Sequence, residues 1–158
     1  MMKIYADTNF FTALYCPGPF EVEAKRLHAE AMRKGAEAYP ITLTGRLEMT
    51  NALQLAAYFT RQGVPGTRLS QEYAVAVEAL FLEQLVEGSF CRPATLSERH
   101  LEKQFMELSH RHTAKEGFRT YDVLHVASAL VLGCHAFWTF DAKAGKLATL
   151  EGLKVNGF

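Results

Sequence analysis

Aspartate is scarce in this chain, and it falls at positions where chemistry could be done. Only three of the 158 residues are aspartates, against fourteen glutamates. Asp7 follows the apolar run 3–6, Asp141 follows the apolar run 136–140, and Asp122 opens the apolar stretch 123–132. The carboxyl ends of parallel strands and the starts of the helices beside them meet in one crevice of an α/β sheet. We therefore expect the three carboxylates to lie close together.

Glu48 is the fourth candidate acid. It comes one turn after Thr44, which we expect to cap a helix that follows a strand at 38–43. Because helical side chains lean toward the N-terminal end of their helix, Glu48 is expected to face the same crevice.

Carboxylates gathered in one place repel one another unless a cation holds them. Hard cations such as Mg²⁺ prefer oxygen ligands. We therefore predict that Asp7, Asp122 and Asp141 bind Mg²⁺ or Mn²⁺, and that Glu48 orients or deprotonates an attacking water. Such a cation lowers the pKa of water and stabilises charge on a phosphoryl oxygen, so the predicted reaction is phosphodiester hydrolysis.

Each acid also has a simpler interpretation. Asp7 could shape the turn Asp-Thr-Asn, Asp122 could interact only with the helix dipole, and Asp141 could cap the helix that follows it. Glu48 could be one of many surface glutamates. Taken singly, these structural roles are favoured. Taken together, the three aspartates all lie at strand ends or a helix start, and this shared placement favours a metal site.

Elements that would position these acids alternate along the chain. Apolar runs at 3–6, 38–43, 89–92, 136–140 and 153–155 are predicted strands, separated by helices near 10–15, 20–34, 44–61, 70–87, 97–114, 121–132 and 143–150. Strand runs that are apolar throughout are typical of a parallel sheet buried on both faces. The pattern and the length predict one α/β domain over 1–158, with helices covering both faces of a parallel sheet.

The charge balance excludes a broadly basic nucleic-acid binder, because 17 basic residues offset 17 acidic ones. A local basic patch stays open, and four basic residues flank the acids in sequence as candidates for phosphate contacts or as solvated surface charge: Arg46, Arg119, Lys143 and Lys146. Three widely spaced cysteines, with no C-x-x-C pair, favour reduced thiols in a cytoplasmic protein. We expect neither a signal peptide nor a membrane span.

Four motifs in order resemble the PIN-domain family, and within it the VapC-type toxins of toxin–antitoxin pairs. They are Asp7-Thr8-Asn9 after the first strand, Glu48 in the helix after the second, the D-x-x-H-x-A-x-A-L stretch 122–130, and the pair Thr139-Phe140-Asp141 and Gly152-Leu153-Lys154-Val155. The resemblance extends from Ile4 to Val155.

The resemblance implies a parallel, five-stranded sheet between helices and an Mg²⁺- or Mn²⁺-dependent endoribonuclease. It also implies an RNA substrate, a cognate antitoxin protein as partner and a homodimer. Some relatives carry a further acid shortly after the position of Asp141, whereas here the next acid is Glu151. The number of metal ions, one or two, is therefore open.

Other residues near the motifs receive structural interpretations. We expect Thr8 and Asn9 to shape their turn, Thr139 to project to the same side as Asp141, and Trp138 to pack in the core. His125 is expected to be a packed or hydrogen-bonded histidine, since hard cations favour oxygen. Two alternatives stay open: a non-catalytic RNA- or protein-binding module, and a phosphoryl-transfer enzyme with an aspartyl nucleophile.

Overall fold

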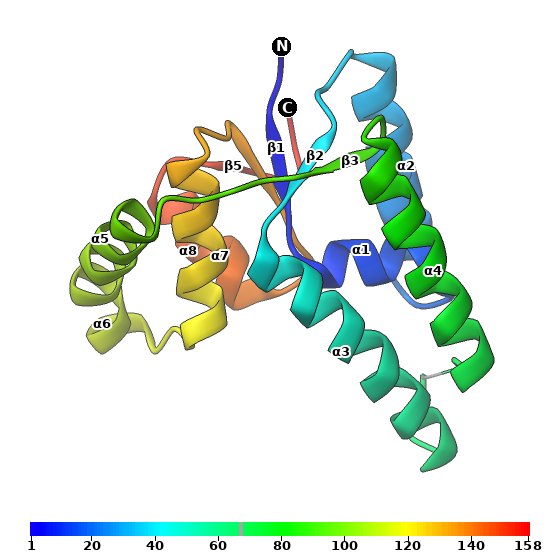
Figure 1. Ribbon diagram of the computed structural model, residues 1–158. Coiled ribbons are helices and arrows are strands. Elements are labelled where there is room, and N and C mark those ends of the chain that lie inside the picture. Colours follow the sequence, from blue (N-terminus) through cyan, green and yellow to red (C-terminus); the bar gives the residue numbers. More distant parts are fainter. Residues whose placement is uncertain (67) are drawn as a thin grey trace.

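The computed structural model describes residues 1–66 and 68–158 (Figure 1). The strands are β1 (Ile4–Ala6), β2 (Tyr39–Ile41), β3 (Cys91–Pro93), β4 (Ala136–Trp138) and β5 (Lys154–Val155). The helices are α1 (Thr8–Tyr15), α2 (Glu21–Arg33), α3 (Leu43–Arg61), α4 (Gln71–Glu87), α5 (Glu98–Leu108), α6 (Ala114–Glu116), α7 (Thr120–Val131) and α8 (Ala142–Leu150), with a π-helical segment, η1 (Ser109–Thr113), between α5 and α6.

The strands pair in parallel, as the apolar runs predict. β1 pairs with β4 and β4 with β5, while β2 pairs with β3, so the hydrogen-bonded ladders form two groups. β2 lies beside β1, which brings the two groups together (Figure 1). β1 therefore has β2, the next strand along the chain, on one side and β4 on the other. The end of β1, where Asp7 lies, is therefore a point at which the strand order reverses.

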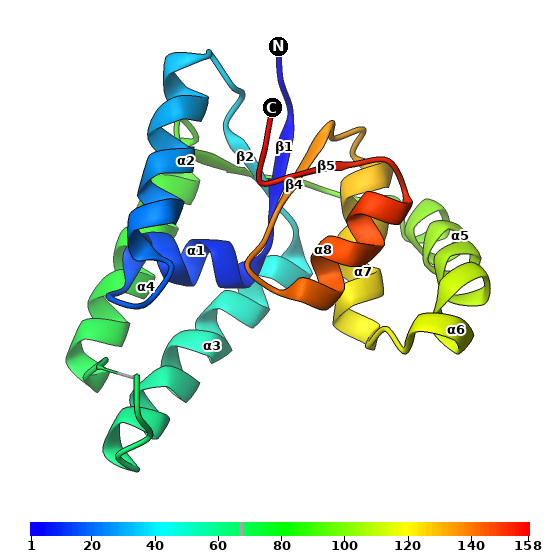
Figure 2. The same ribbon diagram turned by 180° about the vertical axis from the view of Figure 1, so that it is seen from behind.

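Helices cover both faces of the strands, and each face has its own core. Ile4 and Ala6 of β1 pack in the cluster beneath α1, α2, α3 and α4, whereas Tyr5 packs in the cluster beneath α5, α7 and α8. β4 shows the same alternation, since Trp138 joins the first cluster and Phe137 the second. Figure 2 shows these two helix groups on either side of the central strands. Trp138 is fully buried, which confirms its expected place in the core.

The start of α3 differs from the expected one. Its N-cap is Thr42, whose hydroxyl accepts a hydrogen bond from the Gly45 N–H at 3.1 Å, and not Thr44. β2 ends at Ile41, earlier than expected, so the first threonine after it already has the extended backbone that a cap needs. Glu48 therefore lies further into the helix than predicted.

The start of α7 also differs by one residue. The helix begins at Thr120 instead of the expected 121, and its N-cap is Arg119. The Arg119 N–H donates to Oδ2 of Asp122 at 2.9 Å, so an acid inside the first turn satisfies the exposed backbone donor.

The remaining differences are at element ends. β4 stops at Trp138, short of the expected 140, because Thr139 and Phe140 donate their N–H groups to Asn156 and Asn9 side chains instead of to a strand. β3 includes Pro93, which a strand at the edge of its pair tolerates because one side of its backbone needs no partner. No helix in the described part of the chain is both long enough and apolar enough to cross a bilayer.

Candidate active site

The four candidate acids line one cavity of about 320 Å³. Asp7 follows β1, Glu48 lies on α3, Asp122 lies in the first turn of α7, and Asp141 separates β4 from α8. The fold thus brings together side chains from residue 7 to residue 141, as the strand-end positions predict. We call this cavity the acidic pocket. The catalytic and metal-binding roles of its acids stay predictions.

All three aspartates also bond to helix backbone. Oδ1 of Asp7 accepts from the Phe10 N–H at 3.1 Å, and Oδ1 of Asp141 accepts from the N–H groups of Lys143 and Ala144 at 2.8 and 3.1 Å. Asp122 accepts from the Arg119 N–H. Each aspartate therefore has a structural role at a helix start and also lies in the acidic pocket. A capping hydrogen bond uses one carboxylate oxygen and leaves the other to face the pocket.

Asp7 is the most perturbed acid in the pocket. It is 4% exposed, and burial raises the pKa of its carboxyl to about 6. The nearby Thr139 hydroxyl, the charge of His125 and the Phe10 N–H act against this rise in pKa, but they do not cancel it. A buried carboxylate that lacks a full counter-charge is typical of functional sites.

Glu48 is held by a chain of hydrogen bonds across the pocket. Its Oε2 accepts from the Thr8 hydroxyl and lies 2.5 Å from Nε2 of His125, whose Nδ1 is 2.8 Å from the Tyr5 hydroxyl. Partial burial raises the pKa of Glu48, but the hydrogen bonds and charge of His125, helped by Thr8, outweigh it and lower the pKa below its usual value. Glu48 is therefore a carboxylate at neutral pH. The hydrogen-bonded role expected for His125 is confirmed.

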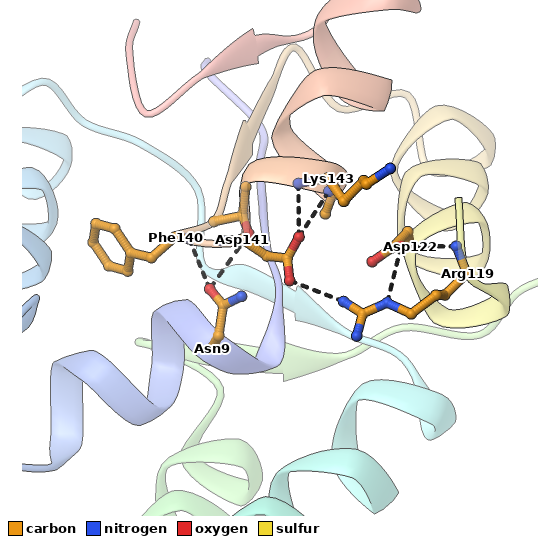
Figure 3. Close-up of polar contacts among 8 residues, drawn as sticks. Asn9, Arg119, Asp122, Phe140, Asp141 and Lys143 are labelled. Carbon is orange, nitrogen blue, oxygen red and sulfur yellow. Dashed lines mark hydrogen bonds and ion pairs between the residues drawn. The ribbon is translucent and has the colours of Figure 1, made fainter. Parts of the chain in front are cut away.

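Arg119 lies between the other two aspartates (Figure 3). Its Nη2 is 3.1 Å from Oδ2 of Asp141, and its Nε is 3.5 Å from Oδ2 of Asp122. One guanidinium thus offsets the charge of two carboxylates, in the place where the sequence predicts a metal ion.

The other candidate phosphate contacts lie outside the acidic pocket. Nζ of Lys143 donates to the Glu116 carbonyl at 2.7 Å, and Lys146 forms an ion pair with the Glu116 carboxylate. Arg46 is exposed and does not line the pocket. Arg119 is therefore the one candidate of the four that the fold brings to the acids.

The donor set fits a divalent cation in type and charge. Asp7, Asp122 and Asp141 offer carboxylate oxygens, the ligands that Mg²⁺ and Mn²⁺ prefer. Across residues 1–66 and 68–158, however, no three His, Cys, Asp or Glu side chains are grouped closely enough to hold a metal ion. A cation between Asp122 and Asp141 would take the place of the Arg119 guanidinium, which already serves them as a positive partner.

Asn9 connects the start of α1, next to Asp7, with the turn that carries Asp141. The sequence did not reveal this role. Its Oδ1 accepts from the Phe140 N–H at 2.7 Å and from the Thr139 hydroxyl at 3.3 Å (Figure 3). The Thr139 hydroxyl in turn accepts from the Asp141 N–H at 2.9 Å. This contact ties the turn that carries Asp141 to the start of α1, and only the assembled fold shows it, since 131 positions separate Asn9 from Phe140.

Comparison with solved structures shows which known fold this is. The VapC20 toxin of Mycobacterium tuberculosis, described as cleaving the sarcin–ricin loop, matches with a TM-score of 0.65 and 22% identity over 96% of each chain. The FitAcB structure from Neisseria gonorrhoeae matches with a TM-score of 0.59 and 14% identity over 96% of this chain and 95% of that one. The chain has the PIN fold.

The PIN fold was predicted from the order of the four motifs, and the comparison confirms it. Sequence similarity does not reach as far, because no family model matches the chain and no curated protein matches it. In this PIN fold the lining of the acidic pocket also includes two polar side chains without a signal in the sequence, those of Thr12 on α1 and of the exposed Tyr121 on α7.

Proposed function

We propose that this protein is an Mg²⁺- or Mn²⁺-dependent endoribonuclease that hydrolyses RNA phosphodiester bonds. The observation that carries the proposal is the convergence of Asp7, Glu48, Asp122 and Asp141 on one cavity. The PIN fold shared with a toxin described as cleaving the sarcin–ricin loop supports the same activity.

Asp7, Asp122 and Asp141 would hold the cation. A bound divalent cation would lower the pKa of the attacking water and offset negative charge on the phosphate. Burial raises the pKa of Asp7 to about 6, so a neighbouring positive charge would stabilise its carboxylate form.

Glu48 positions the water in this proposal. Its lowered pKa makes it a weak base at neutral pH, so accepting a hydrogen bond from the water suits it better than taking the proton early. Thr8 and His125 fix the carboxylate in place, and the Tyr5 hydroxyl fixes the His125 ring.

Arg119 would contact the phosphate once a cation replaces it between the aspartates. Its side chain is 73% exposed, so the guanidinium can turn from the acids to an oxygen of the substrate without breaking core packing. A planar guanidinium suits bidentate contact with a phosphate.

We further propose that the protein acts in the cytoplasm as the toxin of a toxin–antitoxin pair and forms a homodimer. The PIN fold shared with the VapC20 toxin supports the first part. Three free cysteines support a reducing compartment. Co-expression with the neighbouring open reading frame, followed by mass measurement of the purified complex, tests both partner proposals.

The alternative is a non-catalytic RNA-binding PIN module, which the Arg119 contact with two of the acids favours. Phosphoryl transfer through an aspartyl intermediate is less well supported, because the second acid of a D-x-D motif is replaced by Asn9, which holds the Asp141 turn.

The test is cleavage of a labelled single-stranded RNA in Mg²⁺ or Mn²⁺, with and without excess chelator. Asp7→Asn should abolish cleavage and leave the circular dichroism spectrum unchanged. RNA binding without products, insensitive to chelator, would favour the non-catalytic module. Full cleavage in chelator, or by the Asp7→Asn variant, would overturn the metal-dependent mechanism, and phosphate release from small phosphoesters would indicate phosphoryl transfer.

A further inference from the structure

A second cavity, of about 310 Å³, adjoins the acidic pocket. Asn9, Thr12 and Asp141 line both cavities, so the two adjoin where the start of α1 meets the turn that follows β4. Figure 3 shows the Asp141 carboxylate directed toward Arg119 and the Phe140 ring directed the opposite way from the same turn, with Asn9 next to both. The second cavity lies on the Phe140 side, and we call it the aromatic cleft.

Three phenylalanine rings lead from the core to this cleft. Phe10 is fully buried and lies nearly parallel to Phe140, with ring centres 5.8 Å apart and an interplanar angle of 16°. Phe140 is stacked on Phe20, with ring centres 4.6 Å apart and an angle of 5°. Phe20 is 47% exposed. Because one face of Phe20 lies on Phe140, its exposed part offers a further flat surface at the end of an existing stack.

The border of the cleft carries a free polar group. The Asn9 amide oxygen is used by Phe140 and Thr139, whereas its Nδ2 donates to no acceptor among residues 1–66 and 68–158. A flat apolar surface next to an amide donor matches the two features of a nucleobase, a π-face and acceptor atoms at its edge. The volume lies at the lower end of ligand pockets, about 300–1,000 Å³, which suits a ligand of the size of one base.

We propose that the aromatic cleft binds one unpaired base of the RNA, next to the phosphate held in the acidic pocket, by stacking on Phe20. The inference rests on the proposed function for the position of that phosphate. The shared residues Asn9 and Asp141 place the base and the phosphate on two sides of one turn, as adjacent parts of one nucleotide strand require. The cleft would therefore favour single-stranded over paired RNA.

The experiment compares two labelled seven-nucleotide strands by fluorescence anisotropy in chelator, one with bases and one an abasic ribose–phosphate chain of equal length. Wild type should bind the base-bearing strand about 10-fold more tightly, since stacking on an aromatic ring is a large part of single-strand affinity. Phe20→Leu keeps apolar volume but removes the π-face, and it should lose this preference. Phe20→Tyr should retain it.

Tyr58 provides the matched control. It has the same exposed fraction as Phe20, 47%, and also contacts a neighbouring ring, that of Phe59, with centres 5.6 Å apart. Tyr58 lines neither cavity. Tyr58→Leu should therefore keep the wild-type preference for bases, and thermal melting of each variant reports whether it is folded.

Cleavage of the same base-bearing strand in Mg²⁺ separates the two proposals. A Phe20-dependent base preference without any cleavage overturns the nuclease and supports the cleft. Cleavage with an equal base preference in wild type and Phe20→Leu overturns the cleft alone, and leaves that face to a protein partner. Failure of wild type to distinguish the two strands also overturns it.

Discussion

The guanidinium of Arg119 donates from Nη2 to Oδ2 of Asp141 at 3.1 Å, and both residues line the acidic pocket. The same side chain reaches Asp122, so the guanidinium is already a positive partner for the two carboxylates that we expect to hold a metal ion. Exposed ion pairs of this kind contribute only about 0–1 kcal/mol, so a divalent ion can displace Arg119 at little cost.

Arg119→Gln should bind Mn²⁺ more tightly than wild type, because the ion no longer competes with the guanidinium. We expect a gain of a few-fold, consistent with an exposed pair worth at most about 1 kcal/mol. RNA cleavage should fall at the same time, since the phosphate contact is lost. Titration calorimetry with Mn²⁺ measures the first effect. Arg46→Gln is the control, because Arg46 is exposed and lies outside the pocket; equal Mn²⁺ affinity in the two variants would contradict the competition.

Asp7→Asn should be more stable than wild type at neutral pH without metal. The Asp7 pKa rises from 3.8 to about 6 on folding, so the folded state holds its proton more tightly and stability falls as pH rises from about 4 to about 6. The shift corresponds to about 3 kcal/mol above pH 6. Asparagine keeps a side-chain oxygen for the Phe10 N–H but carries no charge, so the variant does not lose this stability as pH rises.

Urea denaturation of both proteins at pH 4 and pH 7.5, in chelator, measures this difference. The variant should gain stability relative to wild type only at pH 7.5, and Mn²⁺ should raise the melting temperature of wild type but not of Asp7→Asn. An equal difference at the two pH values would show that burial of the charge is not its cause.

Glu48→Gln should lower kcat by about 100-fold, the scale on which a misplaced reactant slows catalysis, while RNA binding changes little. Glutamine can still accept from Thr8, but it places an amide where the water needs a carboxylate. Glu78→Gln is the matched control, because Glu78 also accepts a threonine hydroxyl, that of Thr50 at 2.7 Å, yet lies outside the pocket. Single-turnover cleavage rates distinguish them, and similar rates in both variants would remove Glu48 from the mechanism.

Asn9→Ala should destabilise the protein and also slow cleavage, because the Phe140 N–H loses its acceptor and the turn that carries Asp141 loosens. Loss of a half-buried hydrogen-bond partner costs about 1–3 kcal/mol. Asn9→Asp keeps the acceptor but adds a fifth carboxylate to the pocket, so it should recover stability mainly at acidic pH, where the added charge is neutralised. Thermal melting compares these variants with Asn51→Ala, an exposed asparagine of α3. The proposed tie would be wrong if Asn9→Ala melted at the same temperature as Asn51→Ala.

The sequence predicts the parts of the site that follow from strand geometry. Asp7 and Asp141 come directly after apolar runs, and the carboxyl ends of parallel strands meet whatever the loops do. Asp122 follows from its place at the start of an apolar stretch. The N-cap of α3 was predicted wrongly because two threonines could serve. Thr42 and Thr44 are equally good caps by residue type, and the end of β2 selects Thr42.

Contacts between distant segments could not be predicted in the same way. The Arg119–Asp141 pair, the chain from Thr8 through Glu48 and His125 to Tyr5, and the Phe20–Phe140 stack all join residues far apart in sequence. Each depends on the choice of rotamers once the helices have packed, and residue type and spacing carry no information on that choice. The π-helical segment η1 likewise has no local signal that separates it from α5.

The hydrogen bonds from helix backbone to the three aspartates have a genetic consequence. Asparagine satisfies the same N–H groups, and its codons differ from those of aspartate by one nucleotide. A cell harmed by the proposed nuclease can therefore disarm it through a point mutation and still make a folded protein. If the proposed antitoxin exists, such inactive copies would continue to bind it and would leave less of it for the active form.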